Sequence, residues 1–178
     1  MTARFANRLA RTILLASAVL VAGGCAVGSK PTVRDFDSYE EVTIGPVHYV
    51  TPQGTRVLEQ GAGYVDHSIA AVPGGVFTVE VDPSPPRSLR DDADQKKRRF
   101  LRSIPNGRLT SVQYHEVGER RYVRVFAKGT TEGGKELTGV MTYLREKKSA
   151  AVVKSVGPLE YQNELRHATE DLAGRVKL

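Results

Sequence analysis

The sequence predicts an α+β fold: a twisted antiparallel sheet with a four-strand C-terminal meander and two packed helices. Four strand-like runs occur at residues 109–117, 121–128, 136–145 and 150–156. Their connections are too short for parallel crossovers, which need about a dozen residues or more. One apolar stripe with a period near 3.6 residues precedes the meander in the sequence, and a second follows it. Each stripe predicts an amphipathic helix that buries its apolar face against the sheet.

Short extended segments precede the first helix. Val42–Val50 is the first predicted strand, and Pro46 within it indicates an edge position or a break. Arg56–Glu59 and Tyr64–Val72 are extended pieces separated by glycine. Val76–Val81 alternates in polarity, which predicts a strand with one buried face.

The first helix is predicted between a proline-rich segment and Pro105-Asn106-Gly107. Ser88 and Asp91 have the spacing of a capping box. Acidic residues gather in its first turns and basic residues in its last turns, as the helix dipole favours. The apolar stripe consists of Leu89, Ala93, Phe100, Leu101 and Ile104. The second helical stripe, after the meander, consists of Tyr161, Leu165, Ala168, Leu172 and Val176.

The N-terminus has the features of an export signal. Three arginines precede Ile13–Gly28, a segment without charge that is short for a membrane span of about 20 residues. The segment Ala22-Gly23-Gly24-Cys25 resembles the lipobox of bacterial lipoproteins, in which the cysteine is lipidated and becomes the new N-terminus. Ordinary secretion with cleavage nearby and an uncleaved anchor are the two alternatives.

The lipobox resemblance sets the expected organisation of the chain. Residues 1–24 are the predicted signal peptide, residues 25–40 a flexible tether, and residues 41–178 a single α+β domain. The membrane is the expected partner of lipidated Cys25, because several acyl chains anchor a protein stably. Ala26 follows the cysteine, and by resemblance to the lipoprotein sorting rule this favours the periplasmic face of the outer membrane, where the host has one.

Charge is unevenly distributed along the chain. Residues 31–82 hold two basic and eight acidic residues, whereas residues 87–178 hold twenty basic and twelve acidic residues. Such asymmetry indicates either a charged binding surface or two halves that lie against each other. The best surface candidate is a set of basic residues on and just before the first helix: Arg87, Arg90, Lys96, Lys97, Arg98, Arg99 and Arg102.

The order of the elements resembles the PsbP-like family of small α+β domains, which includes bacterial lipoproteins. The strand Phe77-Thr78-Val79-Glu80-Val81 runs into prolines, a helix, a meander and a closing helix, over residues 74–178. The chain has no tryptophan, although members of that family often have one just after the first such strand. The resemblance implies a non-catalytic binding or assembly domain.

Motifs for catalysis, metals and cofactors are weak in this sequence. Gly129–Lys135 has the beginning of a P-loop, but Glu136 stands where a serine or threonine would hold Mg²⁺, so a hairpin loop is expected. The four histidines have no zinc-site spacing. No catalytic residue, metal or cofactor is therefore assigned.

These observations predict an exported, membrane-anchored accessory domain that binds a protein or an anionic component of the cell envelope. Nucleic acid is not an expected partner. A carrier of a small apolar or lipidic ligand, held between the helices and the sheet, is the alternative. A hydrolase is a third, less favoured hypothesis.

Overall fold

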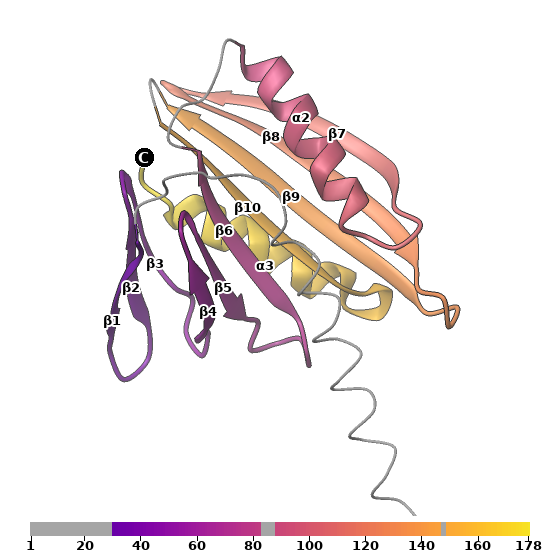
Figure 1. Ribbon diagram of the computed structural model, residues 1–178, viewed down its shortest axis with the longest axis horizontal. Helices are drawn as coiled ribbons and strands as arrows, with labels where there is room; N and C mark the ends of the chain where they lie inside the picture. Colours follow the sequence, from indigo (N-terminus) through magenta and orange to yellow (C-terminus); the bar gives the residue numbers. More distant parts are fainter. Residues whose placement is uncertain (1–29, 83–87, 147–148) are drawn as a thin grey trace, which may run out of the picture.

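The described residues form an α+β fold with two α-helices, as the sequence predicted, but their antiparallel strands make two sheets where the sequence predicted one (Figure 1). The computed structural model describes residues 30–82, 88–146 and 149–178. The smaller sheet has the order β1-β2-β3 and the larger one the order β4-β5-β6-β10-β9-β8-β7. The small sheet comprises β1 (Thr32–Asp35), β2 (Glu40–Ile44) and β3 (Val47–Val50). The large sheet comprises β4 (Val57–Gly61), β5 (Tyr64–Ser68), β6 (Val76–Asp82), β7 (Arg108–Val117), β8 (Arg120–Thr130), β9 (Glu136–Glu146) and β10 (Ser149–Pro158).

The four-strand meander is confirmed. Strands β7 to β10 pair antiparallel with their sequence neighbours, and β10 then pairs with β6. The segment Gly129–Lys135 belongs to the end of β8 and the hairpin connection to β9, where the Lys135 amide donates to Thr131 Oγ1 over 3.1 Å. The P-loop-like segment is thus a hairpin loop, as expected.

The helices cover opposite faces of the large sheet (Figure 1). Helix α2 (Leu89–Arg102) packs over β8 and β9, and helix α3 (Gln162–Arg175), which follows the 3₁₀ helix η2 (Leu159–Tyr161), packs over β9 and β10. Side chains of a strand alternate between its faces, so strand β10 contributes to both cores. Val153 belongs to the cluster on the α3 face and Val152 to the cluster on the α2 face.

The small sheet shares its core with α3. Val42, Ile44 and Tyr49 are fully buried in the same cluster as Leu165 and Leu172 of the helix. A backbone bridge between His48 and Lys177 joins β3 to the C-terminus. The first strands of the chain and its last helix are therefore held together by a common apolar interior.

Two N-terminal predictions need correction. The range 25–40, predicted as a tether, contains β1, because Thr32–Asp35 pair with β2. The predicted strand Val42–Val50 is instead a hairpin of β2 and β3. Pro46 lies at its turn beside Gly45, which has a φ of 56° that favours glycine. Of the two alternatives predicted for Pro46, an edge position or a break, the structure shows the break.

Candidate functional site

Helix α2 begins as the capping pattern predicted. Ser88 Oγ accepts a hydrogen bond from the Asp91 backbone amide over 3.1 Å and donates one to Asp91 Oδ2 over 2.7 Å. Asp91 and Asp92 lie in the first turn, and Arg99 and Arg102 in the last. This arrangement complements the helix dipole and satisfies one of the N-terminal backbone amides of the helix.

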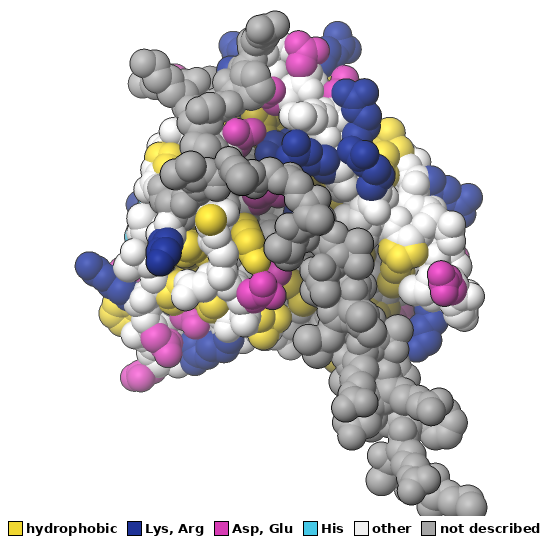
Figure 2. All heavy atoms as spheres, in the orientation of Figure 1, with side chains coloured by type: hydrophobic (Ala, Val, Ile, Leu, Met, Phe, Trp, Pro, Cys, Tyr) yellow, Lys and Arg dark blue, Asp and Glu magenta, His cyan; other side chains and the backbone are white. Residues whose placement is uncertain are grey.

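Four arginines of α2 form an exposed basic surface, which we call the outer arginines: Arg90, Arg98, Arg99 and Arg102. Figure 2 shows blue side chains over the outward face of this helix. The acidic neighbours of these arginines have other contacts. Asp94 forms an ion pair with Lys97, whose hydrogen bond holds the pKa of Asp94 below its usual range. Asp92 faces the sheet, whereas the side chains of all four arginines are exposed to solvent.

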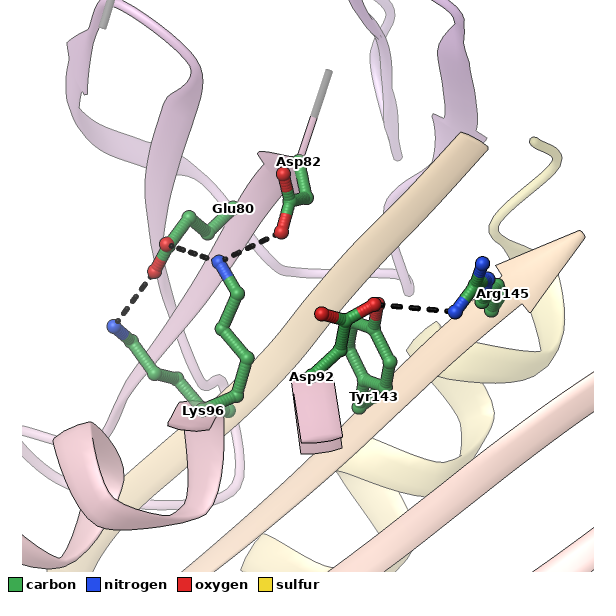
Figure 3. Close-up of polar contacts among 7 residues, drawn as sticks. Glu80, Asp82, Asp92, Lys96, Tyr143 and Arg145 are labelled. Carbon is green, nitrogen blue, oxygen red and sulfur yellow. Dashed lines mark hydrogen bonds and ion pairs between the residues drawn. The ribbon is translucent and has the colours of Figure 1, made fainter. Parts of the chain in front are cut away.

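The predicted basic surface is not continuous. Lys97 is half-buried in its pair with Asp94, and Arg87 lies outside the described residues. Lys96 was predicted to belong to this surface, but it is only 7% exposed and points toward the sheet (Figure 3). Its spacing from Ala93 and Phe100 places it on the buried face of the helix. This spacing could have predicted from the sequence that Lys96 is buried, but its charge favoured an exposed position.

Lys96 forms two ion pairs with strand β6. Its Nζ lies 3.2 Å from Glu80 Oε1 and 3.3 Å from Asp82 Oδ2. Lys154 of β10 lies 3.4 Å from Glu80 Oε2. Burial would raise the pKa of Glu80, but Lys154 and Lys96 outweigh it and hold that pKa below its ordinary value. At this site the acidic segment 31–82 contacts the basic segment 87–178. This agrees with the interpretation that the charge asymmetry reflects two halves lying against each other.

A second polar cluster joins α2 to β9. Asp92 is 3% exposed, and its Oδ2 accepts hydrogen bonds from the Tyr143 hydroxyl over 3.3 Å and from Arg145 Nη1 over 3.1 Å (Figure 3). Burial and the carboxylate of Asp92 raise the pKa of Tyr143. The phenol therefore stays neutral and holds the helix in place, and it does not supply a nucleophile.

A third cluster, which the sequence analysis did not predict, lies in the α3-side core. The Tyr49 hydroxyl and His67 Nε2 are 2.8 Å apart, and Glu40 Oε2 lies 4.0 Å from His67 Nδ1. Burial lowers the pKa of His67 to about 4 and raises that of Tyr49. The position of His67 two residues after buried Val65 was the available signal, since alternate residues of a strand share a face.

This third cluster resembles a catalytic arrangement only in residue type. Tyr49 and His67 are both 0% exposed, and they lie among the apolar side chains of the core between the small sheet and α3. A substrate would have to displace that core to reach them. The cluster therefore connects β2, β3 and β5 structurally, and the imidazole remains neutral at physiological pH.

Within residues 30–82, 88–146 and 149–178, no group of three or more histidine, aspartate or glutamate side chains could hold a metal ion. No helix in those same ranges is long and apolar enough to cross a bilayer. Cys25, the residue predicted to be lipidated, lies outside the described residues.

Sequence comparisons identify no relative: neither a protein-family model nor a curated protein matches the chain. Several solved structures are similar to it at low identity, and three of them are described here. A protein of unknown function from Pseudomonas aeruginosa has 11% identity and a TM-score of 0.48, with 81% of this chain and 93% of that one covered. LpqN of Mycobacterium tuberculosis, described as involved in cell envelope biogenesis, has 12% identity and a TM-score of 0.45, with 86% of each chain covered.

The third structure carries the comparison of folds. It is the cyanobacterial PsbP protein, CyanoP, of Synechocystis sp. PCC 6803, with a TM-score of 0.51. The match covers 90% of this chain and 99% of CyanoP at 11% identity. Likeness at such identity establishes architecture and leaves function to the side chains. The α+β chain thus resembles the PsbP-like fold, as the order of its elements predicted.

Proposed function

We propose that this protein is an exported lipoprotein whose domain binds a partner in the cell envelope without catalysing a reaction. Cys25 carries the lipid in this proposal, and the outer arginines of α2 contact an anionic protein or envelope component. The periplasmic face of the outer membrane is the proposed location, where the host has one. One observation supports the proposed binding surface. These arginines are exposed, while the inward-facing charged residues of the same helix are already paired with the sheet.

The chemistry of the described polar clusters supports a binding role. Lys96 and Asp92, the buried charged residues of α2, are both occupied by contacts to the sheet. These pairs hold the helix rigidly, so the outer arginines project from a fixed support. Guanidinium groups bind carboxylates and phosphates in a planar, bidentate manner, which suits an acidic partner.

The packing between α2 and the meander does not favour the carrier alternative. A Cβ added to Gly139 of β9 would lie 2.7 Å from Ile104 Cδ1 and 2.8 Å from Phe100 Cζ. Met141 and Val125, also beneath the helix, are at most 1% exposed. The space in which a small apolar ligand was expected is filled by side chains along this part of the interface.

The anchor is tested by metabolic labelling with a radioactive fatty acid, comparing the wild type with Cys25→Ser in the native host. Label in the wild type alone is the expected result. If neither protein is labelled, the lipoprotein proposal fails, and secretion or an uncleaved anchor replaces it.

The binding surface is tested by photo-crosslinking in the native envelope. A photoreactive residue at Gln95, which is exposed on α2, should give a discrete crosslinked product. Reversal of Arg98, Arg99 and Arg102 to glutamate should remove it. The matched control reverses Arg34, Lys135 and Lys177, which are exposed elsewhere, and so makes the same change in net charge. Equal loss of the product in both variants would show a general effect of charge and would overturn the assignment to α2.

A further inference from the structure

The start of strand β1 lies close in sequence to the residue that carries the lipid in the proposed function. Seven residue steps separate Cys25 from Thr32, the first residue of β1. A fully extended chain spans about 3.3–3.6 Å per residue, so Thr32 lies within about 25 Å of Cys25. The part of the domain around Thr32 therefore stays near a membrane that holds the lipid.

Strand pairing places Thr32 beside the C-terminal segment. Thr32 lies opposite Thr43 of β2, and Thr43 lies opposite His48 of β3. A backbone bridge then joins His48 to Lys177. Neighbouring strands are about 4.8 Å apart, so Lys177 lies about 14 Å from Thr32 across this row. The chain that leads to Cys25 and the segment that contains Lys177 therefore meet the domain at the same end.

The turn between β7 and β8 belongs to this end as well. Arg120, the first residue of β8, donates from Nη2 to the Val176 carbonyl over 2.8 Å. Its Nε donates to Glu146 Oε1, at the end of β9, over 2.6 Å. We call the part of the domain formed by residues 45–46, 117–120 and 176–177 the anchor end.

Helix α2 runs away from the anchor end. Asp92, in its first turn, forms an ion pair over 3.1 Å with Arg145, which lies near the end of β9. Just beyond the helix, the Pro105 carbonyl accepts a hydrogen bond over 2.9 Å from the amide of Thr130, the last residue of β8. Figure 1 shows the end of α2 on the side of the hairpin between β8 and β9. The last turn of the helix thus lies toward the opposite end of the sheet.

We propose that the anchor end faces the membrane that holds Cys25, and that the last turn of α2 points away from this membrane. This inference rests on the proposed lipidation of Cys25. In an inverted domain the anchor end would stand off the lipid by about the length of β8, whose 11 residues span roughly 33 Å. The chain from Cys25 to Thr32 reaches only about 25 Å. The domain can tilt on this short connection, but it cannot invert.

The side chains of the anchor end suit a lipid surface without determining the orientation. Val117 is 64% exposed, and Lys177 is also exposed. An apolar side chain and a cation of this kind are compatible with the interface between lipid and water. Arg121, beside Arg120, forms an ion pair with Glu116 over 3.2 Å, so its charge is already balanced. The short connection, rather than attraction between charges, therefore sets the orientation.

This orientation restricts the partner of the outer arginines. Arg99 and Arg102 lie in the last turn of α2, whereas Arg90 lies in its first turn, about 18 Å from Arg102 along the helix axis. With the anchor end toward the membrane, the last turn is held away from the lipid phosphates. The anionic component that these arginines bind in the proposed function is then something other than the lipid of the anchoring membrane.

Fluorescence quenching by labelled lipid tests the orientation. The full-length protein is purified from its native host and placed in vesicles of phosphatidylethanolamine and phosphatidylglycerol whose headgroups carry a nitroxide. Cys25 is the only cysteine, so once it is lipidated an engineered cysteine is the only thiol that a fluorophore can label. Lys177→Cys places the fluorophore at the anchor end. Lys135→Cys, in the hairpin between β8 and β9, is the matched control, because it also replaces an exposed lysine.

Quenching at position 177 should exceed quenching at position 135 about twofold or more, because a nitroxide quenches over short distances and the two positions lie at opposite ends of strands about 33 Å long. A second pair of variants compares the two ends of α2. Arg90→Cys should be quenched more strongly than Arg102→Cys, which makes the same change in charge at the other exposed end of the helix.

Flotation of the vesicles in a density gradient separates the two ways in which this experiment can fail. If the protein floats with the vesicles but position 135 is quenched as strongly as position 177, the orientation is wrong and the lipid anchor stands. If the protein does not float with the vesicles, it has no anchor, and the orientation and the proposed lipoprotein both fail. A Cys25→Ser protein labelled at position 177 should neither float nor be quenched.

Discussion

Lys96 Nζ of α2 lies 3.2 Å from Glu80 Oε1 of β6, so a buried lysine connects the first helix to a strand that precedes it in the chain. Asp82 lies 3.3 Å from the same nitrogen. Most contacts of α2 are to β8 and β9, and the lysine extends its attachment across the sheet to β6. The position of the outer arginines therefore depends on this inward-pointing cation.

Removal of Lys96 should destabilise the protein. Lys96→Met keeps the apolar stem but leaves Asp82 without this cation and Glu80 with Lys154 alone. We expect the free energy of unfolding to fall by about 1–3 kcal/mol, less than for a fully buried pair because both carboxylates are partly exposed. Urea denaturation of the purified protein measures the change. Lys97→Met, which breaks the more exposed pair with Asp94, should cost at most about 1 kcal/mol. Equal effects of the two variants would contradict the buried role of Lys96.

Stability should decrease in acid because of His67. Burial lowers the pKa of its imidazole to about 4, whereas an unfolded histidine titrates near 6.5. Between these values the unfolded chain binds more protons than the folded one, so stability is full above about pH 6.5 and falls as the pH drops toward 4. The loss approaches about 3 kcal/mol at the lower end.

The measurement for His67 is urea unfolding between pH 5 and 7. His67→Gln should have a shallower dependence on pH than the wild type, whatever its absolute stability. His167→Gln, at an exposed position of α3, should keep the slope of the wild type. If His67→Gln keeps that slope as well, another group causes the acid sensitivity.

The N-cap of α2 should be worth about 1 kcal/mol. Ser88→Ala removes the acceptor of the Asp91 amide and leaves an N-terminal donor of the helix without a side-chain partner. Ser88→Asp keeps an acceptor and should lose much less. Thermal unfolding of both variants checks the prediction. An alanine variant as stable as the aspartate variant would show that the cap contributes nothing.

Close packing beneath α2 should make Gly139 intolerant of a side chain. The added methyl group of Gly139→Ala would lie too close to Ile104 and Phe100, and overpacking costs about 1–3 kcal/mol. Gly174→Ala in α3 meets no atom within 4 Å and should stabilise the protein by about 0.5–1 kcal/mol. Denaturant unfolding compares them. A neutral Gly139→Ala would mean that space exists under the helix, which would revive the carrier alternative.

Local patterns were sufficient to predict most of the elements. The alternation of Val76–Val81 corresponds to β6, the apolar stripe after Ser88 to α2, and the short connections to the meander. The small sheet was predicted less well, because β1 falls within residues expected to form a tether and the turn at Pro46 separates two strands. Short strands carry little periodicity of their own, and their pairing depends on neighbours.

The sequence by itself determined the fold class, the capped helix and its basic composition, because these follow from spacing along a few neighbouring residues. Only the tertiary structure decided that the buried Lys96 pairs with Glu80 and Asp82, since helical spacing places the lysine on the inward face but does not say which strand it meets. It also decided the pairing of β6 with β10 and the contact of Tyr49 with His67. Such contacts join residues that are distant in sequence, and burial of the apolar core, which is a property of the whole chain, selects them.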